Sequence, residues 1–155
     1  MIFKNKNQEK ARSLIAMVNV LAISSLTSFL DSFPSLNQII KKYRTDDWDF
    51  FMTVAGVSIA LQTNKYKPSD KDIHQFALGL KKYFPKWNSQ AATAFDDLIK
   101  FVKKNGADGI DSVTATGLWV LWNLKRELPT DDEMSLAPII GRFWVDNLSD
   151  WWNQI

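Results

Sequence analysis

Hydrophobic residues recur along this chain at the three- and four-residue spacing of α-helices, and no stretch shows the two-residue alternation of a strand. In the stretch 69–84, Ile73, Phe76, Leu80 and Phe84 share one helical face. Residues 50–61 are apolar nearly all round, which predicts a helix at the centre of the fold. The pattern therefore predicts an all-α, single-domain helical bundle of six to seven helices over residues 1–155, with stacked α-hairpins as an alternative arrangement.

Capping residues, prolines and glycines mark where the helices are expected to begin and end. Pro34 and Pro85 should each end a helix, and cations followed by Asn105-Gly106 should close another. Three pairs match the capping box, in which two side chains three residues apart bond to each other's backbone: Ser35 with Gln38, Ser69 with Asp72, and Thr130 with Glu133.

The remaining boundaries are predicted from single residues. A fifth helix should open at position 88 or 89, and a sixth should run from about Ser112 to Leu128, with Asp111 or Ser112 as its cap. Pro138 lies inside the last helical pattern. We therefore expect either a kink there or a restart with Ser135 as the cap.

The N-terminal segment combines four cations in residues 1–12 with an uncharged run over residues 13–30. That order is typical of a signal peptide, here residues 1–24, or of a short membrane anchor. An anchor is disfavoured because polar residues interrupt a run that is already near the minimum length for a membrane span. A thin polar stripe of Ser13, Ser24, Thr27 and Ser28 favours a buried helix instead, and we expect the protein to be cytoplasmic.

Three similar motifs lie 40 and 44 residues apart: Ile40-Lys41-Lys42-Tyr43, Leu80-Lys81-Lys82-Tyr83 and Leu124-Lys125-Arg126-Glu127. This spacing is typical of α-solenoids built from helical hairpins. The helix dipole, however, favours cations at the C-terminus of any helix, and the helix interiors between the motifs do not match one another. A true repeat and a shared dipole effect both remain as interpretations.

The amino-acid composition excludes several kinds of catalytic and metal-binding site. The 155 residues include no cysteine and one histidine, which excludes disulfides, thiolate metal sites and a cysteine nucleophile. Glycine-rich phosphate loops and a Gly-x-Ser-x-Gly elbow are also missing. His74 follows Asp70 by four residues, so we expect a boundary histidine bonded to that acid rather than a general base, a metal ligand or a haem ligand.

Adjacent acids occur at 46–47, 96–97 and 131–133, but neighbouring residues of a helix point 100° apart and cannot converge on one atom. The first and last groups suit helix N-termini. Asp96 and Asp97 precede Lys100 at the spacing of a solvated ion pair. The loop 105–111 resembles a calcium loop only superficially, because Ala115 stands where an EF-hand requires glutamate. No metal site, cofactor or catalytic residue is predicted.

Charge is distributed unevenly along the chain. Residues 41–104 hold twelve cations and seven acids, a net charge of +5, whereas residues 105–155 carry a net charge of −5. Nucleic-acid binding is disfavoured because the acids are interspersed among the cations and arginine is scarce in the basic stretch. The asymmetry suits a polar protein partner or self-association equally well.

Seven tryptophans are more than a domain of this size usually holds, and Trp119 with Trp122 lies on one face of a very apolar helix. Core packing is the first interpretation for Trp119, Trp144 and Trp151. The alternative is that Trp119 and Trp122 line a pocket for a small apolar or aromatic ligand.

Ile139 and Phe143 form an i,i+4 pair on the otherwise polar half of the last helix, and Trp152 lies at the edge of its apolar stripe. Exposed hydrophobic residues beside polar neighbours are typical of interfaces, so these three are the predicted partner-binding residues. Binding to a membrane surface is disfavoured because Asp146 and Asp150 on the same helix would repel anionic lipid.

Three functions from different classes remain. The preferred hypothesis is a non-enzymatic protein–protein interaction module of adaptor, inhibitor or immunity type, because the fold is well specified while catalytic groups are not visible. The second is a helical bundle that binds a small ligand at Trp119 and Trp122. The third, which we favour least, is an enzyme that uses lysine, tyrosine or aspartate without a recognisable motif.

Overall fold

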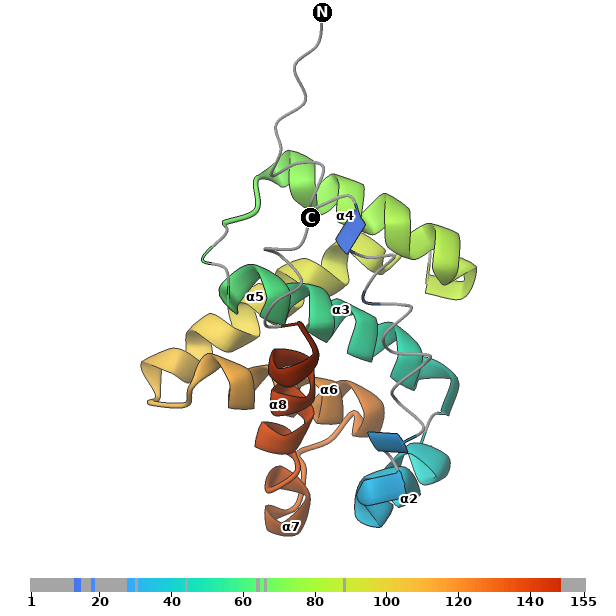
Figure 1. Ribbon diagram of the computed structural model, residues 1–155, viewed down its shortest axis with the longest axis vertical. Coiled ribbons are helices and arrows are strands. Elements are labelled where there is room, and N and C mark those ends of the chain that lie inside the picture. Colours follow the sequence, from blue (N-terminus) through green and yellow to red (C-terminus); the bar gives the residue numbers. More distant parts are fainter. Residues whose placement is uncertain are drawn as a thin grey trace, which may run out of the picture.

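The computed structural model describes residues 13–14, 18, 28–29, 31–43, 45–63, 65, 67–87 and 89–148. Every regular element in these ranges is helical, which confirms the all-α prediction. In chain order the elements are α2 (Pro34–Tyr43), α3 (Thr45–Thr63), α4 (Asp70–Tyr83), the 3₁₀ turn η1 (Pro85–Trp87), α5 (Ala91–Ala107), α6 (Ser112–Lys125), α7 (Asp131–Met134) and α8 (Ala137–Leu148) (Figure 1). The extent of the domain, 1–155, stays a prediction.

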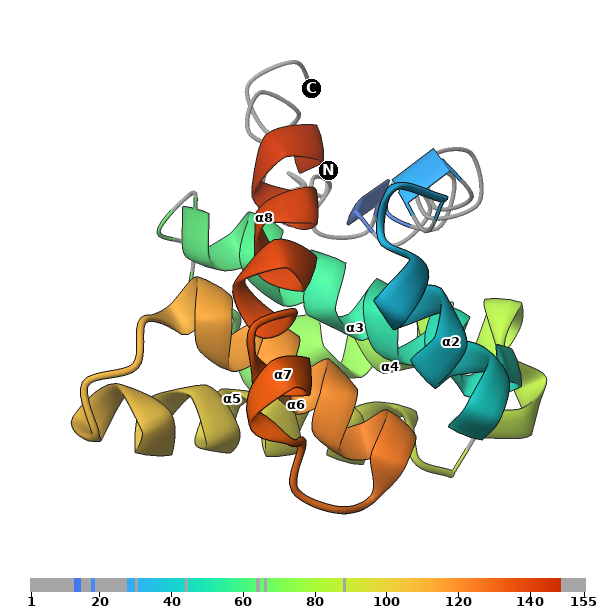
Figure 2. The ribbon, with the colours of Figure 1, turned by 90° about the horizontal axis from the view of Figure 1, so that it is seen from below.

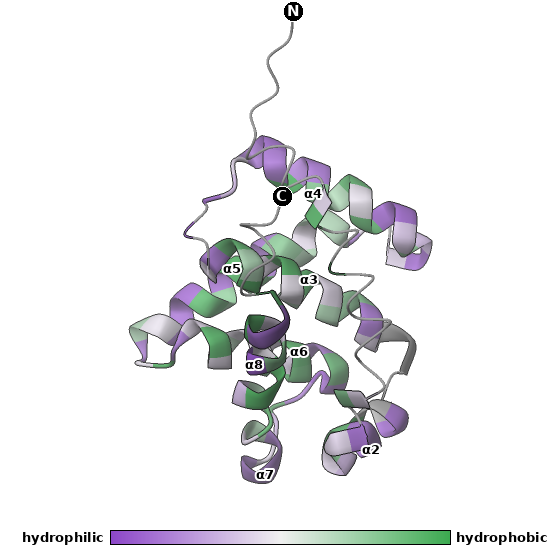
Figure 3. Ribbon diagram, in the orientation of Figure 1, coloured by the Kyte–Doolittle hydropathy of each residue, from purple (hydrophilic) through white to green (hydrophobic). Residues whose placement is uncertain are grey.

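Helix α3 lies at the centre of the fold. Every side chain from Phe50 to Leu61 is buried, as the all-round apolar sequence predicts, and Figure 3 colours much of this helix as hydrophobic. Helices α6 and α8 both pack against α3, and α8 crosses the two of them (Figure 2). Helix α5 packs on α6 and α3, and α4 packs on α5. As a result, α3, α5 and α6 meet along a common edge.

Glycines allow α6 and α8 to approach each other closely. A Cβ atom at Gly117 would overlap the carbonyl oxygen of Ala137, and a Cβ atom at Gly141 would overlap the carbonyl oxygen of Val113. The backbones can make these contacts only because neither glycine carries a side chain. This pair of helices has the most extensive contact among the described elements.

Two predicted capping boxes are confirmed. At the start of α4, the Ser69 hydroxyl accepts the Asp72 backbone N–H at 3.2 Å, and the Asp72 carboxylate accepts the Ser69 N–H at 3.0 Å. Thr130 and Glu133 form the same reciprocal pair at the start of α7. In both places a local sequence motif is enough to satisfy backbone donors that the first helical turn leaves unbonded.

Other predicted boundaries are wrong. A helical segment at 31–32 does end before Pro34, but Pro34 is itself the first residue of α2, so Ser35 lies inside that helix rather than capping it. Proline is well suited to a first helical position because its missing N–H would have no partner there. Gln90, not Ser89, precedes α5, and α6 ends at Lys125 rather than at Leu128.

The predicted break within the last helical pattern is confirmed as a restart. Helix α7 ends at Met134 and α8 begins at Ala137, with Pro138 in its first turn, where no backbone N–H is needed. Ser135 is not the cap of α8, because its hydroxyl donates to the Asp132 carbonyl oxygen of α7 at 2.6 Å.

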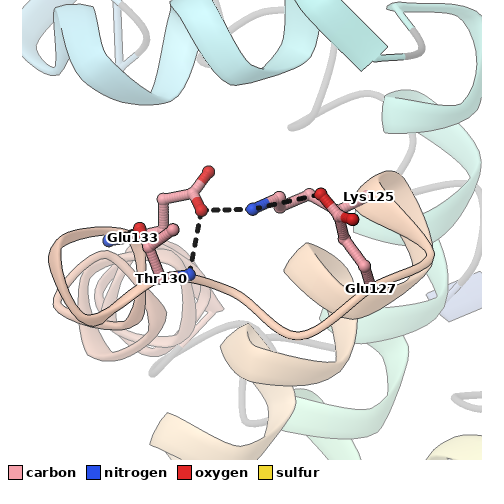
Figure 4. Close-up of polar contacts among 4 residues, drawn as sticks. All are labelled: Lys125, Glu127, Thr130 and Glu133. Atoms are coloured by element: carbon pink, nitrogen blue, oxygen red, sulfur yellow. Dashed lines mark hydrogen bonds and ion pairs between the residues drawn. The ribbon is translucent and has the colours of Figure 1, made fainter.

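A buried ion pair holds the connection from α6 to α7 (Figure 4). The side chain of Lys125 is 3% exposed, and its Nζ binds the carboxylate of Glu133, with Glu127 Oε1 at 3.9 Å. The same carboxylate accepts the backbone N–H of Thr130 at 2.9 Å. Burial by itself raises the pKa of Glu133, but the bonds from Lys125 and Thr130 outweigh burial and hold that pKa below its ordinary value.

The predictions of a signal peptide at 1–24, a membrane anchor or a buried helix at 14–30 fall mostly outside the described residues. Leu14 and Val18, which are described, are fully buried. In the part of the chain that the structure describes, no helix is long and apolar enough to cross a membrane.

Candidate functional site

An open cleft with a volume of about 460 Å³ lies where α3, η1, α5 and α6 meet. We call it the aromatic cleft, because its walls combine five aromatic side chains with a rim of mostly polar ones. The lining residues are Phe50, Phe51, Trp87, Gln90, Thr93, Ala94, Asp97, Trp119, Trp122, Asn123 and Arg126. The two tryptophans expected from the sequence to share a pocket therefore lie in the same cavity.

The buried rings of the cleft hold one another in place. Phe50 and Trp87 are stacked, with ring centroids 4.6 Å apart and planes only 5° apart. Phe51 meets Trp87 and Trp119 edge to face, at centroid distances of 5.3 and 5.6 Å. Each such pair contributes about 0.5–1.5 kcal/mol beyond the burial of its area. The floor of the cleft is thus a preformed aromatic surface drawn from α3, η1 and α6.

Asp97 ties the α5 wall of the cleft to the α6 wall. The indole Nε1–H of Trp119 donates to Asp97 Oδ2 at 2.8 Å, which fixes the orientation of the ring. The predicted solvated ion pair with Lys100 forms with Asp96, where Oδ2 and Nζ are 2.9 Å apart. Asp97 is one position further along, about 100° around the helix, and therefore faces α6 instead.

Arg126 lies at the rim of the cleft in an uncommon backbone conformation. Its φ of 58° and ψ of 26° are left-handed, a conformation that glycine usually supplies after the last turn of a helix. Its backbone N–H donates to the Trp122 carbonyl oxygen at 2.7 Å. A left-handed conformation costs a non-glycine residue about 1 kcal/mol, and such strain is concentrated at functional positions.

The two tryptophans of α6 differ in exposure. Trp119 is almost completely buried, whereas Trp122 is 39% exposed and presents part of its indole surface to solvent. The cleft therefore offers an apolar aromatic wall together with a carboxylate, a guanidinium, two carboxamides and a hydroxyl. This combination can stack a flat ring and orient its polar substituents.

The surface predicted to bind a partner is less exposed than the helical pattern of the sequence indicates. Phe143 is only 8% exposed, so its expected role as an exposed anchor is wrong: its ring lies 4.6 Å from that of Phe29 and 4.9 Å from that of Trp144. Ile139 is half-buried and lines a depression of about 390 Å³ together with Phe143. Trp152 lies outside the described residues. The contact with Phe29 joins segments far apart in sequence, so the pattern of one helix cannot predict it.

The remaining sequence-based candidates form no site. His74 is exposed on α4, and the described residues show no hydrogen bond from it to Asp70, contrary to expectation. Asp111, in the loop that resembles a calcium loop, caps α6 by accepting the Thr114 backbone N–H at 3.0 Å, and this bond lowers the pKa of the carboxyl below its ordinary value. Over the described ranges, no group of three or more histidine, aspartate or glutamate residues could hold a metal ion.

Comparisons with known proteins found no match among protein-family models, curated proteins or solved structures. The geometry of the aromatic cleft is therefore the basis for assigning a candidate site.

The sequence predicted Trp119 and Trp122 as pocket residues but not the other lining residues of the cleft, among them Trp87, Asp97 and Arg126. Trp87 follows Pro85 in a short turn and belongs to no periodic pattern. Asp97 bonds a residue 22 positions away, beyond the reach of any helical spacing. No local signal pointed to Arg126 either, because the sequence predicts that its helix continues to Leu128, whereas the structure ends that helix at Lys125.

Proposed function

We propose that the protein binds a small aromatic ligand in the aromatic cleft. The observation that carries the proposal is the convergence of five aromatic side chains from three elements on one open cavity. A volume of about 460 Å³ lies within the range of roughly 300–1,000 Å³ that small-molecule sites occupy. Trp122 keeps 39% of its surface exposed beside these rings, so part of the aromatic wall is accessible to a ligand.

The residues have distinct roles in this proposal. Trp122 stacks on the ligand ring, while Trp119, held by Asp97, forms a fixed apolar wall. Arg126 binds an anionic substituent, because its planar guanidinium pairs well with a carboxylate and stacks on aromatic faces. The preferred ligand is thus an aromatic carboxylate of about ten to fifteen non-hydrogen atoms, judged from the size of the cleft.

The first experiment is native mass spectrometry of the protein purified gently from its own host. An added mass of a few hundred daltons on the chain would support the proposal. The variant Trp122→Ala should lose that mass, whereas Tyr83→Ala should retain it. Tyr83 is the matched control because it is 40% exposed, almost the same as Trp122, and does not line the cleft.

A titration with chosen probes tests the site even if the ligand is lost in purification. We expect 2-naphthoate to shift the indole N–H resonances of Trp119 and Trp122 and to bind about tenfold more weakly to Trp122→Ala. Neutral naphthalene should bind more weakly than 2-naphthoate to the wild-type protein. If 2-naphthoate at millimolar concentration does not shift these resonances, the cleft is not a binding site for aromatic carboxylates.

A protein-interaction surface around Ile139 is the second candidate function, favoured by the depression of about 390 Å³ at Ile139 and Phe143. Because Phe143 is buried, its replacement by a charged residue would damage the fold and cannot test binding. Ile139→Asp is the informative variant, with Leu128→Asp as an exposed control. If the same partners co-purify with Ile139→Asp as with the wild-type protein, this second candidate is contradicted.

A further inference from the structure

A second cavity, separate from the aromatic cleft, lies towards the other end of α3. It has a volume of about 280 Å³ and is lined by residues from the last turns of α3, the beginning of α4 and the middle of α5. Figure 1 shows where these three helices lie in the fold. Its walls are formed mainly by aliphatic side chains, among them Leu61, Ile73, Leu98 and Val102. Ile99 also lines it and is 45% exposed, so the cavity is open to solvent on that side.

Among the described residues, one polar atom at the wall of this cavity has no hydrogen-bond partner. Gln62 lines the cavity, and its Oε1 is buried without a hydrogen bond to any described residue. The other end of the same carboxamide is fixed, because Nε2 donates to Ser58 Oγ at 2.8 Å. Buried carbonyl oxygens in native proteins are nearly always bonded, so an unpaired one at the wall of a cavity indicates a missing donor.

The charge and size of the cavity limit which molecules could supply the hydrogen-bond donor for Gln62 Oε1. Among the described residues that line it, Lys103 carries the only charge, so a cationic donor would be repelled. A cavity of about 150 Å³ holds benzene, so 280 Å³ has room for roughly ten non-hydrogen atoms. A single water could satisfy Gln62 but would leave the aliphatic walls uncovered.

We propose that this cavity binds a small uncharged apolar molecule that carries one hydroxyl group, such as a phenol, with the hydroxyl donating to Gln62 Oε1. The proposal does not depend on the function proposed for the aromatic cleft, because the two cavities share no lining residue.

The test compares p-cresol with p-xylene, two molecules of nearly the same shape that differ by a hydroxyl in place of a methyl. Binding is followed through the ¹³C-methyl resonances of Ile73 and Ile99, which line this cavity and not the aromatic cleft. We expect p-cresol to bind at least as tightly as p-xylene, although its hydroxyl is the more costly group to remove from water.

The variant Gln62→Met keeps the length of the side chain and replaces the carbonyl acceptor with a thioether, which accepts hydrogen bonds only weakly. It should reverse the preference, so that p-xylene binds about tenfold more tightly than p-cresol. Gln90→Met, which changes a glutamine at the aromatic cleft instead, should leave the preference of the wild-type protein intact.

Two results would overturn the proposal. One is the absence of methyl shifts with either probe at millimolar concentration. The other is a clear preference of the wild-type protein for p-xylene, which would mean that Gln62 Oε1 does not accept the hydroxyl. The comparison of p-xylene with p-cresol in the wild-type protein does not involve a variant, so it remains decisive even if Gln62→Met folds poorly.

Discussion

At the scale of single residues, Lys125 and Glu133 depend on each other. The Glu133 carboxylate balances the charge of Lys125, whose side chain is 3% exposed, and the same carboxylate completes the capping box of α7. Removing the carboxylate would leave the lysine charge buried, which typically costs more than the intact pair gains.

The first prediction concerns pH. Because the pKa of Glu133 in the folded protein is below its ordinary value of 4.5, the carboxylate stabilises the fold fully above that value, and this stability is lost as the pH falls through the lowered pKa. Glu133→Gln should therefore reduce the free energy of unfolding by about 3 kcal/mol at pH 7, with a smaller difference near pH 2. Urea unfolding at both pH values measures this difference in the free energy of unfolding.

The control is Asp131→Asn, which changes an exposed acid in the same turn and should alter stability by less than about 1 kcal/mol. An equal loss of stability in both variants would contradict the pairing of Glu133 with Lys125.

The second prediction concerns the backbone at Arg126. Arg126→Gly should raise the free energy of unfolding by about 0.5–1 kcal/mol, because glycine adopts the left-handed conformation without strain, and should at the same time weaken the binding of 2-naphthoate. Lys65→Gly is the matched control, since Lys65 also has a positive φ, 53°, but does not line the cleft. It should gain similar stability with no change in binding. Unchanged 2-naphthoate affinity in Arg126→Gly would remove Arg126 from the proposed site.

At the scale of elements, the crossing of α6 and α8 depends on the absence of side chains at the points of contact. Gly117 and Gly141 each face a backbone carbonyl of the other helix, and a carbonyl cannot move aside as a flexible side chain can. This contact therefore determines how closely α8 approaches α3. The distance between α8 and α3 in turn determines how deeply Trp144 is buried.

The third prediction follows from this contact. Gly117→Ala should lower the free energy of unfolding by about 3 kcal/mol, because the added methyl overlaps the Ala137 carbonyl oxygen and forces the helices apart. Gly106→Ala, at a helical position with open space around it, should leave stability unchanged or raise it by up to about 1 kcal/mol. Thermal unfolding of both variants decides the matter. A neutral Gly117→Ala would show that the two helices can separate at little cost.

At the scale of the whole molecule, the helices differ in how strongly they are held. Among the described elements, α3 is buried along most of its length and packs against α5, α6 and α8, whereas α2 makes limited contact with α3 and α6. Local opening should therefore be easier for α2, because it exposes less apolar surface.

The fourth prediction is that amide hydrogen exchange separates these two helices. Amides of Phe50–Leu61 should exchange only through global unfolding, with the free energy that urea denaturation gives, while those in the second half of α2 should exchange through a local opening of lower free energy. Exchange measured by NMR over hours to days tests this. Equal protection of α2 and α3 would contradict it.

The sequence by itself determined the features that depend on neighbours within a few residues. Helical periodicity, the capping boxes at Ser69 and Thr130, and the central position of the apolar stretch in α3 could all be read from local spacing. It also placed Trp119 and Trp122 on one face, and these are two of the five aromatic residues that line the cleft. The boundaries predicted at Ser35 and Leu128 are wrong, because α2 begins at Pro34 and α6 ends at Lys125. Local patterns define the existence of a helix better than its terminal residues.

Only the tertiary structure decided which faces meet. The hydrogen bond from Trp119 to Asp97, the stack of Phe50 on Trp87 and the covering of Phe143 by Phe29 each join residues that no local spacing relates. The same holds for the glycines between α6 and α8. The physical reason is that helix formation is governed by local hydrogen bonds and side-chain patterns, whereas cavities and interhelical contacts arise from the fit of whole surfaces, which the chain specifies only when all of its helices pack together.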